Sequence, residues 1–140
     1  MNNHWGTNYR AYQEGLTRFR FVLRPYRKSD PAENSRFATG FSQPLLATGA
    51  RGAKPSGTPF LSVEPDDVLV TALKPSDDGG AVIVRLFGTS AQARSARLRW
   101  GAATPKGVFL TDTSEHAGKP VGDRIEVPAS GLVSLRAEFR

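Results

Sequence analysis

The second half of the sequence, from residue 60 to the end, consists of short apolar runs separated by turn residues. The run 81–87 is rich in β-branched residues, and in 132–140 apolar and polar side chains alternate. Alternation with a period of two predicts a strand with one buried face. Several such strands at close spacing are typical of an antiparallel β-sandwich, and the 14 Gly and 10 Pro residues supply the turns that such a fold needs. The sequence therefore predicts an all-β fold.

The expected strands of this half can be placed from the alternation and the turn residues. They are 60–63, 67–73, 81–87, 93–100, 108–111, 124–127 and 132–140. In the last of them we expect Val133, Leu135, Ala137 and Phe139 to face the core, and Ser134, Arg136, Glu138 and Arg140 to face solvent. A further half-buried strand is expected at 17–24, where Phe19, Phe21 and Leu23 alternate with arginines.

One short helix is expected near 30–42. Asp30 can cap its first turn, Pro31 suits the first helical position, and Glu33 occupies the acidic position of a capping box. The following residues 47–59 are rich in Gly and Pro and lack large apolar side chains, so we expect a long irregular loop.

The composition limits the class of protein. A length of 140 residues suits a single domain, and the absence of cysteine excludes disulfides and thiolate metal sites. No apolar run is long enough for a membrane span, and the first residues lack the pattern of a signal peptide. We expect a soluble protein, with the cytoplasm favoured over export. The net charge of +6 could attract polyanions, but the arginines read as dispersed residues on solvated strand faces, so we expect no nucleic acid partner.

No pattern in the sequence points to catalysis. His4 and His116 lie in different segments, and neither has a partner at metal-ligand spacing. The acidic pairs 66–67 and 77–78 fit turns or strand entries better than the carboxylate pair of a glycosidase, because adjacent residues on a strand point to opposite faces. We therefore expect no catalytic residue and no metal ligand in this chain.

The two tryptophans raise the question of sugar binding, since aromatic rings stack on pyranose faces. Trp100 shares a strand face with Leu98 and is expected in the core. Trp5 lies among polar residues that include Asn3 and Asn8, a mixture that suits either a hydroxyl-rich ligand or a packed loop.

A resemblance to a known family covers nearly the whole sequence. The segments that carry it are 1–9, 15–21, 67–79, 82–87, 110–112 and 131–136, which include Met1-Asn2-Asn3-His4-Trp5, Leu73-Lys74-Pro75-Ser76-Asp77-Asp78-Gly79 and Arg85-Leu86-Phe87. They resemble, in order, the last β-region of bacterial-type family 38 α-mannosidases. Gly88 departs from the Asn or Glu that usually follows the aromatic residue.

The resemblance implies that residues 1–140 form a single C-terminal β-sandwich domain, the last part of a galactose-mutarotase-like supersandwich, in a fragment of a larger enzyme. In this family the nucleophile, the acid/base and the zinc ligands lie in an N-terminal catalytic domain. The chain would then hold no cofactor of its own, and the catalytic domain of the same parent chain would be its partner. The Met-Asn-Asn of residues 1–3 lies deep inside the family's chains, which also fits a fragment.

The resemblance also implies candidates for the rim of the substrate cleft. They are Asn3, Trp5, Asn8 and Arg85, which would contact mannose-containing glycans. For Arg85 the plainer interpretation is a strand arginine paired with an acid.

Two other functions stay open at this point. A free-standing carbohydrate-binding module should bind mannose by itself, and a basic polyanion-binding domain should show steep salt dependence. The accessory-domain hypothesis predicts neither. It predicts instead an exposed apolar patch where the missing domain docks, with self-association as a consequence.

Overall fold

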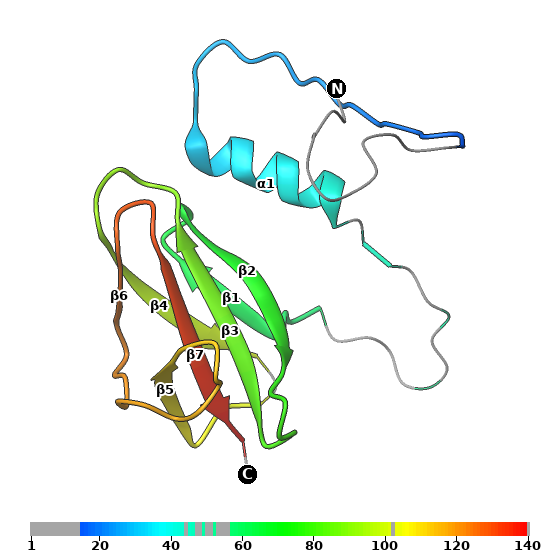
Figure 1. Cartoon of the computed structure of the whole chain (residues 1–140). Helices are drawn as coiled ribbons and strands as arrows, with labels where there is room; N and C mark the ends of the chain where they lie inside the picture. The colour runs from blue at the N-terminus through cyan, green and yellow to red at the C-terminus, as the bar shows by residue number, and fades with distance from the viewer. Residues whose placement is uncertain are drawn as a thin grey trace, which may run out of the picture.

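Seven strands and one helix make up the regular structure of the protein, as seen in a computed structural model that describes residues 15–43, 45–46, 49, 52, 57–101 and 103–139 (Figure 1). In chain order the elements are α1 (Pro31–Ser42), β1 (Leu61–Glu64), β2 (Val68–Pro75), β3 (Ala81–Gly88), β4 (Arg94–Trp100), β5 (Gly107–Thr111), β6 (Ile125–Val127) and β7 (Leu132–Glu138). Each of these strands lies within two residues of its predicted position.

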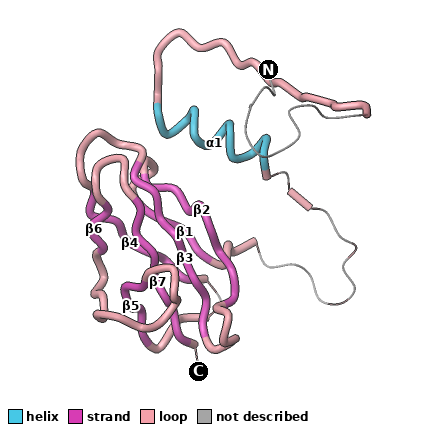
Figure 2. The backbone as a smooth tube through the Cα atoms, in the orientation of Figure 1, coloured by secondary structure: helices cyan, strands magenta, loops and turns pink. Residues whose placement is uncertain are grey.

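The strands form two antiparallel sheets. One has the order β1-β4-β6 and the other the order β2-β3-β7-β5 (Figure 2). All three pairs of neighbouring strands in the larger sheet are antiparallel, with Val84 of β3 opposite Leu135 of β7. The prediction of an all-β antiparallel sandwich with one short helix is confirmed.

The core lies between the two sheets. The larger sheet contributes Val84, Leu86 and Leu135, and the smaller sheet contributes Ala96 and Val127, all of them fully buried. Each large side chain buried here contributes about 1.5–3 kcal/mol to folding. The alternation that predicted these strands therefore reflects the packing of one sheet on the other.

An aromatic cluster closes one end of the core. Trp100 packs against Phe60 and Phe139 with ring centroids 5.7 and 5.4 Å apart, both in edge-to-face geometry. The ring of Trp100 is half-buried among core residues, as the strand pattern predicted. These contacts place Trp100 in the packing of the sandwich.

Helix α1 begins as the sequence predicts, at a cap provided by Asp30. The Asp30 carboxylate accepts hydrogen bonds from the N–H groups of Ala32 and Glu33 at 2.9 and 3.1 Å. Glu33 does not complete a capping box; its carboxylate pairs with Arg24. Arg36 donates to the backbone carbonyl of Asp66, so the helix is fastened to the turn between β1 and β2.

The predicted strand at 17–24 is wrong. No strand pairing among the described residues includes this segment, and residues 16–26 run as extended chain beyond α1, away from the sandwich (Figures 1 and 2). Leu16, Phe21 and Leu23 are 94%, 76% and 92% exposed. Alternation describes a strand only where a partner edge exists, because an unpaired strand leaves its backbone groups and its apolar side chains in water. The predicted loop 47–59 falls mostly outside the described residues.

A second correction concerns Arg136, which was expected to face solvent. It is only 8% exposed. Residues 112–119, which we call the strap, fold over the outer face of the larger sheet beside β7. The Arg136 Nη1 group donates to the carbonyl oxygen of Glu115 in the strap at 3.0 Å, and Nη2 donates to Asp78 Oδ2 at 2.8 Å. Arg136 Nε donates to Glu138 at 3.0 Å. Each of the three guanidinium nitrogens thus donates to an acceptor, and these bonds allow the charged group to be buried.

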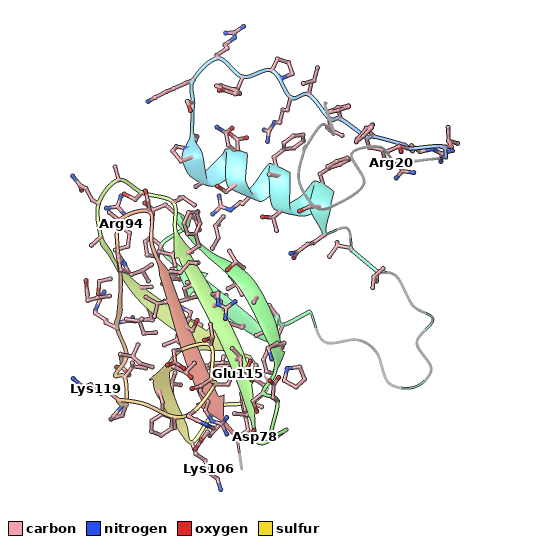
Figure 3. All side chains as sticks on the ribbon, viewed as in Figure 1. Arg20, Asp78, Arg94, Lys106, Glu115 and Lys119 are labelled. Carbon is pink, nitrogen blue, oxygen red and sulfur yellow. The ribbon has the colours of Figure 1, made fainter. Side chains whose placement is uncertain are left out.

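The strap is also fixed through the side chain of Glu115. Its carboxylate pairs with Lys74 Nζ at 2.5 Å and accepts the Asp77 N–H at 2.8 Å. Hydrogen bonds from Lys74 to Asp77 and Glu115 raise the pKa of Lys74. Ile83 lies between Lys74 and Arg136 in the sheet register, on the outer face, and is nevertheless fully buried. The strap therefore covers one end of this face, as the positions of Asp78 and Glu115 in Figure 3 show.

Removal of the Arg136 guanidinium should destabilise the fold. We expect Arg136→Met to lower the midpoint of thermal unfolding by about 5 °C or more, because Asp78 and the Glu115 carbonyl lose their partner. The matched control is Arg97→Met, since Arg97 is exposed on β4. Differential scanning calorimetry measures both midpoints, and equal values for the two variants contradict the role of Arg136.

The stability should also depend on pH through Asp78. Hydrogen bonds from Ser76, Gly80 and Arg136 hold the pKa of Asp78 well below its ordinary value of 3.8. As the pH falls, the unfolded chain binds the proton first, so the stability that Asp78 contributes is complete above about pH 4 and is lost below it. Urea unfolding at about pH 6 and about pH 3 should show a smaller acid-induced loss for Asp78→Asn than for the wild type. The same loss in both proteins argues against this assignment.

Candidate functional site

A cleft of about 1080 Å³ lies between the start of α1 and the turns that join the two sheets at that end. Its walls come from residues 28–33 and 36, from the turn 65–67, and from 89–91 and 94. Arg94 Nε pairs with Asp67 Oδ2 across the cleft wall at 2.6 Å, and Figure 3 places Arg94 at the end of the sandwich near α1. The cleft is thus a seam between the helix and the sandwich.

The acids that line the cleft are engaged in structural bonds. Asp30 caps α1, Glu33 pairs with Arg24, and Asp67 pairs with Arg94. One oxygen, Asp67 Oδ1, is buried with no hydrogen-bond partner among the described residues. The lining includes no aromatic ring. This lining lacks both the stacking platform of a sugar site and a pair of unengaged carboxylates.

Arg85 lies on the outer face of the larger sheet. Its Nε group donates to Ser134 Oγ on β7 at 3.0 Å, and the side chain is half-buried. None of the ion pairs formed by the described residues includes Arg85. The expectation of an acidic partner for this arginine is therefore wrong. Its charge is available to a group from outside the described chain.

The other rim candidates cannot be placed beside Arg85. Asn3, Trp5 and Asn8 lie outside the described residues. On the outer face itself, Leu69, Phe87 and Leu132 occupy neighbouring register positions next to Arg85 and Ser134, and Leu132 is 59% exposed. Arg85 thus lies at the edge of an apolar row that the strap does not cover.

The positive charge is concentrated in one segment. Residues 15–29 contain Arg18, Arg20, Arg24, Arg27 and Lys28 and no acidic residue. They account for five of the six net charges, since the rest of the chain has 14 basic and 13 acidic residues. Figure 3 shows Arg20 away from the sandwich. The expectation of dispersed arginines missed this segment because the strand prediction had assigned those side chains to an ordinary solvated face.

Sequence reasoning also missed the bonds around Arg136. Its partners Asp78 and Glu115 lie 58 and 21 residues away in the chain, so no local pattern links them.

The described residues bring together no group of three or more His, Cys, Asp or Glu side chains able to hold a metal ion. No helix among them has the length and apolarity to cross a membrane.

Comparison with known proteins identifies the β-rich half of the chain. The family model for the glycosyl hydrolases family 38 C-terminal beta sandwich domain matches residues 67–137. Comparison with curated proteins gives no match. Among solved structures, apo exo-carrageenase GH42 from Bacteroides ovatus is similar, with 12% identity and a TM-score of 0.42. The match covers 77% of this chain and 13% of that chain. From the family match, the chain belongs to the family 38 glycosyl hydrolase C-terminal β-sandwich domains.

Proposed function

We propose that this chain is a non-catalytic C-terminal domain of an α-mannosidase-like glycoside hydrolase, and that it braces the catalytic domain of the same parent protein. A glycoside-hydrolase-associated domain follows from the family. The step to an α-mannosidase rests on the resemblance of the segments 1–9, 67–79 and 82–87. In this proposal the substrates are mannose-containing glycans, and hydrolysis takes place outside this chain.

The observation that carries the bracing role is the contrast between the sandwich and the preceding segment. The sandwich buries most of its large apolar side chains between its own sheets, and its exposed exceptions are Phe60, Leu73, Leu110 and Leu132. In 16–46, by contrast, apolar side chains lie exposed: Leu16, Phe19, Phe21, Val22, Leu23, Tyr26, Phe41, Leu45 and Leu46. A patch of this kind marks a surface for another protein part. These exposed side chains are consistent with the predicted docking surface, and they support the bracing role.

The described residues do not fit a zinc site. They gather no cluster of three or more potential ligands, and the acids around the cleft are engaged in caps and ion pairs. Zinc chemistry, if the parent uses it as the resemblance implies, would belong to the catalytic domain.

Arg85 is the rim candidate with a described position. It has a guanidinium without an acidic partner among the described residues, beside an apolar row. Such a group could donate hydrogen bonds to the hydroxyl groups of a glycan bound at the seam with the catalytic domain. Asn3, Trp5 and Asn8 are proposed for the same rim from the resemblance alone.

The bracing role can be tested with the two parts produced separately. The chain alone should hydrolyse p-nitrophenyl α-mannoside no faster than buffer, and mannobiose should give no binding heat. Added in excess to the separately produced catalytic part, the chain should raise the thermal unfolding midpoint of that part by about 5 °C, because it binds only the folded form.

This experiment has one control and two outcomes that would change the interpretation. An unrelated basic protein at the same concentration is the control for non-specific charge effects. Mannobiose binding by the chain alone would favour a carbohydrate-binding module. An unchanged midpoint of the catalytic part would contradict the bracing role.

The rim role of Arg85 predicts a specific kinetic effect in the parent enzyme. Arg85→Ala should raise the KM for a mannose oligosaccharide about 10-fold with little change in kcat, since a contact at the cleft rim acts on binding. Arg97→Ala, on an exposed position of the smaller sheet, is the matched control. If Arg85→Ala and the control have the same KM, Arg85 has no role at the rim, and its bond to Ser134 serves only the packing of the sheet.

A further inference from the structure

The segment 16–24, which we call the arm, has the pattern of a β-strand and no partner among the described residues. Its backbone is extended, and Phe19, Phe21 and Leu23 alternate with residues of the opposite face. Their side chains are more than half exposed. An amphipathic strand without a neighbour presents a row of free N–H and C=O groups together with an apolar face. The open edge of another sheet would pair the free N–H and C=O groups and would also cover the apolar face.

The arm is fastened to the rest of the protein at its last residue. The Arg24 guanidinium pairs with Glu33 of α1 and lies 5.5 Å from the centre of the Phe37 ring. The residues before it, 16–23, are exposed throughout. The described residues of the arm are therefore held beside α1 at Arg24, while residues 16–23 stay exposed.

The positive charge of the arm indicates which kind of sheet edge it would bind. Arg18 and Arg20 lie on the face opposite the phenylalanines, and Arg27 and Lys28 follow just beyond the arm. Paired in a sheet, the phenylalanines would extend an apolar core, while the arginines would lie over the outer face of the neighbouring strand. The matching neighbour has acidic side chains there, because opposite charges on facing strands stabilise the pair and like charges oppose it.

A second copy of this chain does not match these requirements. Residues 15–29 carry five positive charges, and the remainder is close to neutral. In a pair of copies the two basic arms would repel each other, and the remainder of the chain offers no net negative charge to offset them. A neighbour with net negative charge suits the arm better.

We infer that the arm binds as an added edge strand on a β-sheet with an acidic outer face, in the part of the parent protein that precedes this domain. This inference rests on the proposed function and names the contact through which the brace is attached. Phe41, Leu45 and Leu46, exposed at and beyond the end of α1, extend the same docking surface.

The test uses the full 140-residue chain and, as the probe, the preceding part of the parent protein produced separately. Isothermal titration calorimetry gives the Kd, and hydrogen exchange with mass spectrometry reports on residues 16–24. We expect exchange in the arm to slow about 100-fold on binding, because the amides gain hydrogen bonds. Phe21→Ser and Arg20→Glu should each raise the Kd about 10-fold or more.

Two control variants carry the same kinds of change elsewhere. Leu73→Ser removes an exposed apolar side chain from β2 of the sandwich, and Lys119→Glu reverses an exposed charge on the strap. Both should bind the probe with the Kd of the unaltered chain, because neither belongs to the arm.

The outcomes separate the inference from the proposed function. If the probe binds, but the arm variants bind as tightly as the controls and exchange in 16–24 is unchanged, the inference is wrong and the bracing role stands. If the probe does not bind at all, both are wrong. Arm protection in a dimer of the chain alone, or only on addition of double-stranded DNA, would replace the acidic sheet edge with a second copy or a polyanion.

Discussion

The pairing of β3 with β7 is the constraint on which the rest of the sandwich depends. These strands occupy the middle of the larger sheet, and Val84 and Leu135 face each other there with no exposed surface. Their inward side chains pack on Ala96 and Val127 of the smaller sheet. The edge strands β2 and β5 join this pair, and Arg136 of β7 holds the strap on the opposite face. Core and strap are thus both organised by β7.

The functional interpretation rests on a contrast between two parts of the chain. The sandwich has a buried core, whereas the side chains of the arm are exposed. The two sheets bury most of their apolar side chains against each other, and the bonds around Arg136 cover part of the outer face of the larger sheet with partners from the chain itself. The arm has the opposite character, with exposed aromatic side chains and most of the net charge. The sandwich therefore has a core of its own, whereas docking on another part of a parent protein is the role that we propose for the preceding segment.

The sequence predicted the elements well where a single local rule decides them. Period-two alternation located the seven strands, and Asp30 with Pro31 located the start of α1. The same alternation failed for Arg136, because the strap that buries it comes from residues far along the chain. It also failed for 17–24, where the pattern is correct for a strand but no described segment pairs with it. Of the rim candidates, only Arg85 has a described position. Its partner Ser134 lies opposite it because of the β3–β7 register, and the sequence does not reveal that register.

The size of the native polypeptide in cells of the source organism tests the central claim most directly. An immunoblot with an antibody raised against this chain measures it. The account predicts a single band far larger than 15.2 kDa, the mass of these 140 residues, because the proposed function makes this domain one part of a larger glycoside hydrolase. A band at 15.2 kDa would contradict it. The exposed arm would then need a partner encoded elsewhere, and the relation to α-mannosidases would describe ancestry only.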